Sequence, residues 1–312
     1  MDFYDLGRKA GGNMCARGIY PGRKVAREGA QALEQIKETQ RRLEKRAWNP
    51  MPTAVEWILD NAYLALREGN LAGEEFKHSR YLRRTKQTAY LRAVTDCLVG
   101  AVPNPKEDEL LEFLKGLQET GPLSEEELSL FLPGLRVALC CRLAQLCQQV
   151  EVRPDDENAA NQLSAIFDGL RTISTSNLGP TLERSSVVEQ ILRRDPAGAY
   201  EKMSEETRAY YRYQVCRLAR KHHISEKEAA ECALSLSGGA QGKKAHIGWF
   251  LFQEPLGKQK KQASGVLYVA AILLPTFFIA LWLGFALQSP ALFFSLAIKC
   301  PSPAILWGHK RI

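Results

Sequence analysis

The chain has 312 residues; 45% are aliphatic, aromatic or cysteine and 25% are charged, a composition ordinary for a protein with a packed core. Its net charge of +7 is a mild excess, well short of a dedicated nucleic-acid-binding protein. The eight cysteines show no CxxC spacing, which argues against a metal site and favours buried, reduced thiols.

Residues 1–50 form a basic N-terminal segment with eleven Lys and Arg against six Asp and Glu. Anionic lipid and nucleic acid both attract such an excess, and a solvated helix face needs neither. We favour the solvated face, because charge runs usually have no other role. Within the segment, Gln31 to Arg46 has a highly charged helical pattern that "WNPMP" ends.

A helical module is predicted over residues 51–252, and its first helix begins at Thr53. Thr53 and Glu56 have the spacing of a capping box, and Gly69 is predicted to end the helix. Apolar residues recur between them at helical spacing, which predicts one buried face made of Val55, Ile58, Leu59, Ala62, Tyr63 and Leu66.

Similar signals continue along the module. Ser124 and Glu127 form a second capping box, Pro133 is predicted to interrupt that helix, and an apolar helix resumes at residue 135. Only "AHIGWFLF", residues 245–252, has the character of a strand. The remaining helices are predicted over residues 108–117, 158–170, from 186, over 204–221 and over 226–236. Ser186 starts the third of these, Ser204 caps the fourth, and Ser225 with Glu228 caps the last.

The C-terminal part of the chain has the pattern of a membrane anchor. No charged residue occurs from Gln262 to Ile298, and residues 265–287 could cross a hydrocarbon core of about 30 Å at about 1.5 Å per residue. Residues 253–264 form a basic polar linker whose lysines predict a cytoplasmic N-terminal side. A second apolar piece, residues 291–298, is too short to cross by itself.

The stretch from Leu192 to Arg212 mixes arginines with tyrosines, as nucleic-acid surfaces do. Along the helix that begins at Ser204 one seam is predicted, with Tyr210 and Arg217 beside it; its members are Thr207, Tyr211, Val215, Leu218 and Lys221. Tyrosines in such a seam are typically half-buried packing residues, and no sheet platform is predicted. We therefore expect no nucleic-acid partner. Arg208 and Arg212 are predicted to pair with Glu205 or Asp195.

Recognisable catalytic signatures are missing from the sequence, which has no Gly-rich phosphate loop, no GxSxG and no HExxH. Asp155 and Asp156 are predicted to cap the following helix, and His222 and His223 to contact carbonyl groups at a helix end. His246 is isolated in the sequence. No catalytic residue, cofactor or metal ligand is predicted in this chain.

Three motifs in the same order resemble the N-terminal region of cyclic β-1,2-glucan synthases, very large bacterial inner-membrane proteins. They lie within residues 50 to 285 and read "AVEWILDNAY", "VVEQILRRDPAGAYEKMSEETRAYYR" and "HIGWFL". The family-motif residues with a structural or unknown role are Glu56, Trp57, Asp60, Asn61, Tyr63, Glu189, Arg193, Asp195, Pro196, Gly198, Tyr200, Thr207, Arg208, Tyr211, Arg212, His246 and Gly248.

The resemblance implies an all-α cytoplasmic module followed by a C-terminal transmembrane helix in the bacterial inner membrane. In that family a later domain transfers glucose from UDP-glucose with a divalent metal, and such a domain does not fit after Leu287. The residues 288–312 are therefore expected to be a truncated or frameshifted tail. Whether the chain is an enzyme stays open, and its expected partners are the bilayer and the missing catalytic domains or other subunits. The alternative is a self-standing, membrane-anchored helical scaffold that binds a protein partner.

Overall fold

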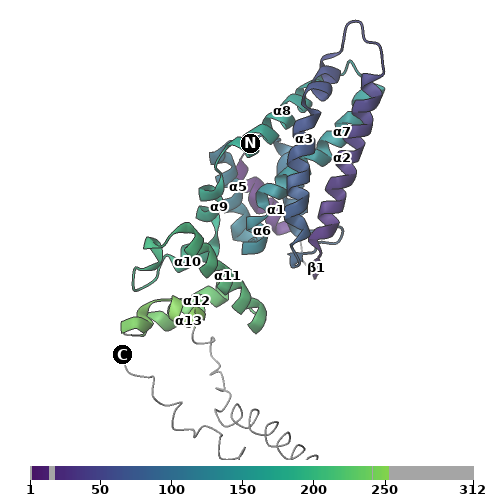
Figure 1. Ribbon diagram of the computed structural model, residues 1–312. Helices are drawn as coiled ribbons and strands as arrows, with labels where there is room; N and C mark the ends of the chain where they lie inside the picture. The colour runs from purple at the N-terminus through teal and green to yellow at the C-terminus, as the bar shows by residue number, and fades with distance from the viewer. Residues whose placement is uncertain (1, 14–17, 241, 253–312) are drawn as a thin grey trace, which may run out of the picture. The chain divides into compact units, whose positions relative to one another are not determined.

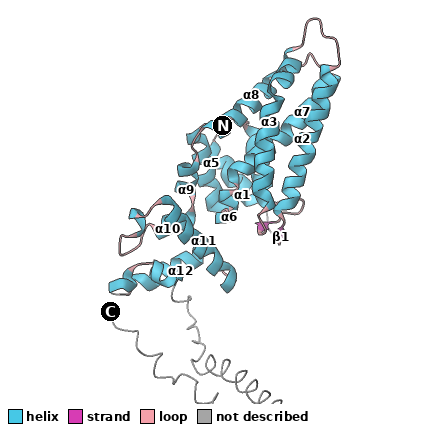
Figure 2. Cartoon of the chain, viewed as in Figure 1, coloured by secondary structure: helices cyan, strands magenta, loops and turns pink. Residues whose placement is uncertain are grey.

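The computed structural model describes residues 2–13, 18–240 and 242–252, which all belong to one compact unit. Within these ranges the chain folds into thirteen α-helices, and two strands of two residues each form the one sheet. Figure 2 shows that most of the described residues lie in helices. The predicted all-α class is confirmed for this part of the chain.

The helices follow one another with short connections. The α-helices are α1 (Phe3–Asn13), α2 (Gly22–Glu44), α3 (Thr53–Lys77), α4 (Tyr90–Ala101), α5 (Glu107–Thr120), α6 (Glu125–Ser129), α7 (Phe131–Val152), α8 (Glu157–Thr175), α9 (Gly179–Ser185), α10 (Val187–Leu192), α11 (Glu205–His222), α12 (Glu226–Gly238) and α13 (Gly248–Phe252). The other elements are the 3-10 helices η1 (Tyr200–Lys202) and η2 (Gly242–Ala245) and the antiparallel strands β1 (Ile19–Tyr20) and β2 (Leu82–Arg83).

A first hydrophobic core lies among α1 to α8, where the long helices α2, α3, α7 and α8 pack side by side (Figure 1). The predicted apolar face of α3 is largely correct, because Val55, Ile58 and Ala62 are fully buried. Tyr63 is the exception, with 64% of its surface exposed. It lies at the edge of the apolar stripe, where a side chain reaches solvent.

Most of the predicted helix caps are confirmed. Ser124 and Ser225 form capping boxes with the glutamates three residues later, and Ser186 and Ser204 accept backbone N–H groups of α10 and α11. Asp156 accepts two N–H groups at the start of α8. The capping box predicted at Thr53 is wrong, since Pro52 occupies the N-cap and gives no side-chain hydrogen bond.

The prediction that Gly69 ends its helix is wrong, because α3 continues to Lys77. The glycine is buried where α3 crosses α2 and α7. A Cβ atom at this position would come within 2.7 Å of Leu33 Cδ2 and 3.1 Å of Cys140 Sγ. Gly69 therefore serves close helix packing, which a helix-ending signal in the sequence cannot reveal.

The N-terminal segment is more structured than predicted. The helix expected from Gln31 begins at Gly22, and α1 was not predicted at all because its glycines lower helix propensity. Two of them let α1 approach α5 closely: a Cβ atom on Gly7 would lie 2.0 Å from the Phe113 carbonyl oxygen, and one on Gly11 2.3 Å from Thr120 Oγ1. Pro133 lies in the first turn of α7, and the break between helices falls before it, at Leu130.

A second, smaller core lies among α10 to α13. The strand predicted over residues 245–252 is wrong, since this stretch contains the end of η2 and the helix α13. Along α11 the predicted seam is partly right: Val215 and Leu218 are buried and Tyr211 is half-buried, whereas Thr207, Lys221 and the neighbouring Tyr210 are exposed. The buried members of this core are Val188, Ile191, Leu192, Tyr200, Val215, Leu218, Ala219, Ala229, Ala230, Ala233, Ile247, Phe250 and Leu251.

Two predictions concern cysteines and the membrane. The cysteines in the described ranges are free thiols, and Cys140, Cys147 and Cys216 are buried, as expected.

Among the helices of the described ranges, none combines the length and apolar character that crossing a membrane requires. The predicted span, residues 265–287, and the tail after it lie outside the described residues.

Candidate functional site

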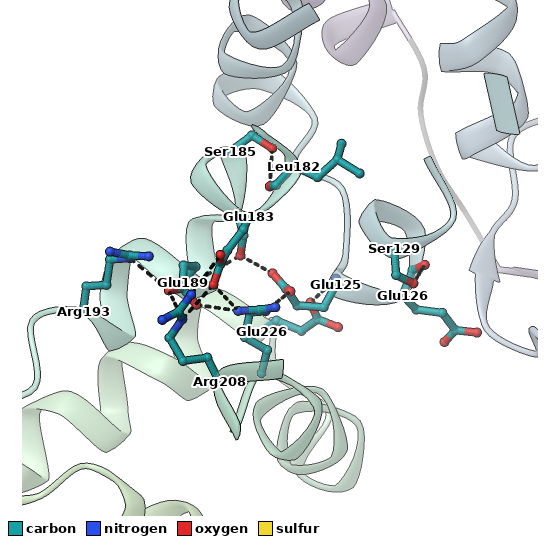
Figure 3. A network of polar contacts seen from close by, with 12 residues as sticks. Glu125, Glu126, Ser129, Leu182, Glu183, Ser185, Glu189, Arg193, Arg208 and Glu226 are labelled. Atoms are coloured by element: carbon teal, nitrogen blue, oxygen red, sulfur yellow. Dashed lines mark hydrogen bonds and ion pairs between the residues drawn. The ribbon is translucent and has the colours of Figure 1, made fainter. Parts of the chain in front are cut away.

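Charged side chains from four helices meet beside the second core. We call Glu125, Glu183, Glu189, Arg208 and Arg212 the carboxylate–arginine cluster; they come from α6, α9, α10 and, for both arginines, α11. Figure 3 shows Glu183 and Glu189 converging on Arg208. All five side chains are at most 16% exposed, so their charges interact with little screening by water.

The contacts within the cluster are short and mutually complementary. Arg208 donates from Nε and Nη2 to the two carboxylate oxygens of Glu183, at 2.8 and 3.1 Å. Arg212 donates from Nη1 to Glu189 at 2.6 Å and to Glu183 at 3.2 Å, and its Nε lies 3.3 Å from Glu125 Oε2. Such charge-assisted, partly bidentate hydrogen bonds fix the relative positions of the helices that carry them.

Glu189 is the centre of the cluster. Its side chain is 1% exposed and accepts hydrogen bonds from Arg212, from Arg193 at 2.9 Å and from the Tyr200 hydroxyl at 2.6 Å. Burial raises the pKa of Tyr200, and its hydrogen bond to Glu189 acts in the same direction. The Tyr200 hydroxyl therefore keeps its proton and remains a donor to the carboxylate.

A second polar group, the aspartate–histidine clasp, joins Asp195, Tyr211, His246 and Ile247. Asp195 accepts from His246 Nδ1 at 2.8 Å and from the Ile247 N–H at 2.9 Å. Burial alone would raise the pKa of Asp195, but these two hydrogen bonds hold it below the usual range. Because the aspartate is ionised, His246 Nδ1 is the donor, and its Nε2 can accept from the Tyr211 hydroxyl, 2.9 Å away.

Two glycines of the motif fit this clasp. A Cβ atom on Gly248 would lie 2.5 Å from the Tyr211 hydroxyl and 2.6 Å from His246 Nε2. Gly198 has a φ of 60°, a conformation that favours glycine. It lies in the turn that follows Pro196, and after this turn the Ala199 and Tyr200 N–H groups donate to Asp195. Both glycines therefore serve the geometry of the clasp.

The order aspartate, histidine, hydroxyl resembles the arrangement of nucleophilic triads. Here burial raises the pKa of Tyr211, and the Asp195 charge acts in the same direction. The phenol is therefore a poorer acid than a free tyrosine and is not activated as a nucleophile. The clasp acts by holding the start of α13 against η1 and α11.

The motif residues do not all meet at one place. Glu189, Arg193, Tyr200, Arg208 and Arg212 belong to the carboxylate–arginine cluster or touch it. Asp195, Tyr211 and His246 belong to the clasp, and Pro196, Gly198 and Gly248 lie beside it. Tyr200 and Tyr211 connect the two groups, with ring centroids 5.6 Å apart. Thr207 is exposed, and its hydroxyl lies 3.0 Å from Ser204 Oγ at the cap of α11.

The motif in α3 lies apart from this site, against the first core. Trp57 stacks on Phe167 of α8, with ring centroids 6.3 Å apart. Asn61 donates to the Trp57 carbonyl oxygen at 3.1 Å. Glu56, Asp60 and Tyr63 are exposed on α3. We conclude that the predicted site residues form two separate groups.

Two of the five cluster residues, Glu125 and Glu183, are not among the residues singled out from the sequence. Arg208 and Arg212 were predicted to pair with Glu205 or Asp195, but their partners are Glu125, Glu183 and Glu189. His246, which is isolated in the sequence, contacts Asp195. No local signal marks these partners, because they come from other helices and only the fold brings them together.

A pocket of about 380 Å³ borders the cluster, and its lining includes Glu125, Arg212, Tyr213, Cys216 and Arg220. Burial raises the pKa of the Cys216 thiol, and the nearby Glu226 acts in the same direction, so the thiol is unreactive.

Within the described ranges, no group of three His, Cys, Asp or Glu side chains is placed to hold a metal ion. The chain matches no protein-family model and no curated protein.

The cluster predicts a stability that depends on pH near neutrality. Burial raises the pKa of Glu125 to about 7, and the charges of Glu226 and Glu189 act in the same direction, against the Ser186 hydroxyl and Arg212. A glutamate in the unfolded chain has a pKa of about 4.3. Folding therefore takes up a proton when the pH lies between this value and about 7. We expect the free energy of unfolding to fall as the pH rises through this window.

Denaturant unfolding at about pH 5 and about pH 8 measures this dependence. Glu125→Gln, which keeps an oxygen for the Ser186 hydroxyl, is expected to lose most of this dependence. A remainder comes from Glu226 and Asp96, because burial raises the pKa of each. Glu112→Gln, on the exposed face of α5, is the matched control and keeps the dependence of the unchanged chain. An equal pH dependence in the Glu125 variant and the control contradicts the prediction.

Proposed function

We propose that this chain is the cytoplasmic, non-catalytic helical module and membrane anchor of a cyclic β-1,2-glucan synthase-like protein. In this proposal residues 265–287 cross the bacterial inner membrane and residues 1–252 lie in the cytoplasm. The reaction of such a synthase, glucosyl transfer from UDP-glucose to a β-1,2-glucan, would be carried out by domains outside this chain. UDP-glucose and the divalent metal would be bound there too.

One observation carries the proposal: motif residues that carry the resemblance make direct contacts with one another. Spread over residues 189 to 248, they supply three members of the carboxylate–arginine cluster and most of the aspartate–histidine clasp, linked by Tyr200 and Tyr211. The motif residues are therefore neighbours in space as well as in the motif, which supports the resemblance. The network orders the helices that directly precede the basic linker and the predicted span.

This arrangement suggests what the module does. Its ion pairs tie the last helices of the module to α6 and α9, next to the first core. The predicted anchor follows α13 after a short linker. A rigid support at this point would hold the module in a defined position relative to the membrane and to any catalytic domain beside it.

Complementation in trans tests the proposal. In a bacterial strain whose cyclic β-1,2-glucan synthase lacks the region before its first membrane span, we expect the co-expressed full chain to restore glucan synthesis. Glu189→Ala, which removes the centre of the cluster, is expected to abolish this rescue, whereas Glu112→Ala keeps it. A chain that is present in the membrane at normal levels but restores no glucan contradicts the proposal.

The anchor is tested separately by extracting membranes with alkaline carbonate. The full chain is expected to stay in the membrane fraction, and the double variant Leu274→Arg/Leu281→Arg is expected to leave it. Each arginine at the centre of a span costs about 2.5–3.5 kcal/mol on insertion scales. Complete extraction of the unchanged chain contradicts the anchor.

A second candidate, a self-standing anchored scaffold for a protein partner, is favoured by the exposed side of α3. Glu56, Asp60 and Tyr63 are spaced by four and three residues, so they share one face, and all three are exposed. Exposed aromatics beside charged groups are common at protein interfaces. A photo-crosslinking amino acid at position 63 that captures the same protein in a strain without any glucan synthase would favour this scaffold.

A further inference from the structure

The exposed side of α11 carries an unusual set of side chains. Tyr210, Tyr213, Arg217 and Lys221 are spaced by three, four and four residues, so they form one stripe along the helix, which we call the α11 stripe. Tyr210 and Tyr213 are 53% and 56% exposed, and the two basic residues are exposed as well. Neither Arg217 nor Lys221 forms an ion pair with a residue of the described ranges.

The aromatic surface continues onto α13, the last described helix. Phe252 is 40% exposed and stacks on Tyr210, with ring centroids 5.4 Å apart. The Phe252 ring also meets Tyr211 edge-on, with ring centroids 4.9 Å apart. Tyr210 and Phe252 thus form an ordered, exposed aromatic pair beside the stripe.

These residue types suit the surface of an anionic membrane. Aromatic side chains that combine an apolar ring with a polar group, such as tyrosine, concentrate at the boundary between lipid and water. Lys and Arg near such a surface are attracted by the anionic headgroups. The acidic Glu206 lies on the same face in the first turn of α11, where its charge complements the helix dipole. It is at the opposite end of the helix from Arg217 and Lys221.

The position of α13 in the chain points to the same partner. Phe252 precedes Gly265, the start of the predicted span, by 13 residues. A fully extended chain of that length reaches about 45 Å and a helical one about 20 Å. Lys258, Lys260 and Lys261 lie in the same interval of the sequence, so the connection is itself basic.

We propose that the α11 stripe and Phe252 rest on the headgroup layer of an anionic membrane, at the cytoplasmic surface. This inference rests on the membrane anchor proposed above, which brings the surface within reach of lipid. The contact would orient the second core on the bilayer, with Tyr210, Tyr213 and Phe252 at the level of the headgroups. Arg217 and Lys221 would contact the lipid phosphates.

Photo-crosslinking of the full chain in lipid vesicles tests the proposal. A benzophenone amino acid replaces Tyr213 in one sample and the equally exposed Tyr63 of α3 in the other, and the vesicles contain radiolabelled phosphatidylserine. After irradiation we expect several-fold more lipid adduct at position 213 than at position 63. Arg217→Ser/Lys221→Ser is expected to lower the adduct at 213 in anionic vesicles, whereas the control Arg41→Ser on α2 leaves it unchanged.

The outcomes separate the surface from the anchor. Equal adduct at the two positions overturns the membrane contact, whether or not the chain resists carbonate extraction. Extraction of the chain by carbonate overturns the anchor alone, and the ratio of adducts then still decides the surface. An adduct at position 213 that forms with an added single-stranded oligonucleotide and not with lipid assigns the stripe to nucleic acid and also overturns the proposal.

Discussion

Glu189→Ala is expected to destabilise the second core by about 3–5 kcal/mol, the usual cost of removing one partner from a buried ion pair. The variant leaves the buried guanidinium of Arg212 without its closest carboxylate, at 2.6 Å, and the Tyr200 hydroxyl without its acceptor. Both groups then lie in a place that water cannot easily reach. Glu189→Gln retains an acceptor for Tyr200 and is expected to cost less.

Amide hydrogen exchange of the full chain measures this effect helix by helix. We expect faster exchange in α10 to α13 and little change in α2, α3 and α7, because the two groups of helices have separate hydrophobic cores. Glu112→Ala removes an exposed partner of Lys115 and is expected to cost at most about 0.5 kcal/mol. Glu189→Leu combined with Arg212→Leu is expected to cost less than the sum of the single variants.

If exchange of α10 to α13 in Glu189→Ala matches that in Glu112→Ala, the cluster does not stabilise these helices. A uniform increase over all helices would show instead that the two cores unfold as one unit. The first result would remove the physical basis for a rigid support next to the predicted anchor.

Gly116→Ala is expected to detach α1 from α5. A Cβ atom on Gly116 would lie 2.0 Å from the Tyr4 carbonyl oxygen and 3.1 Å from the Arg8 nitrogen. These are backbone atoms, so no side-chain rotation can relieve the clash, and α1 has to move. We expect a loss at the upper end of the about 1–3 kcal/mol typical of overpacking, larger than the roughly 1 kcal/mol that alanine gains over glycine inside a helix.

Gly12→Ala is the matched control in α1, because a Cβ atom on Gly12 would meet no atom within 4 Å. Its effect is expected to be neutral or stabilising by up to about 1 kcal/mol. Limited trypsin cleavage after Arg8 and Lys9 reads out whether α1 has separated from α5. Equal cleavage in the Gly116 and Gly12 variants would contradict the close approach of the two helices.

Features that depend on near neighbours in the chain were predictable. The caps at Ser124, Ser186, Ser204 and Ser225 are correct because a capping side chain is satisfied by a backbone N–H three residues later. The buried face of α3 follows from the same short-range regularity. Thr53 fails as a cap although it has the right spacing, since the helix begins one residue earlier than the motif requires.

Features that depend on distant neighbours were not predictable. Gly69 reads as a helix end, but it faces Leu33 and Cys140 from other helices. Arg208 and Arg212 have acids close by in the sequence, yet their partners come from α6, α9 and α10. His246 looks isolated because Asp195 is 51 residues away.

The sequence by itself determined the all-α class, most helices and their caps, and the apolar stretch over residues 265–287, because periodicity, capping and hydropathy are properties of neighbouring residues. It also identified the motif residues, but not what they contact. Only the tertiary structure decided that those of the second core form an ion-pair cluster and a clasp, and that Tyr210 and Tyr213 face outward. Those outcomes depend on which helices pack together, and burial and charge pairing between distant segments leave no pattern within any one of them.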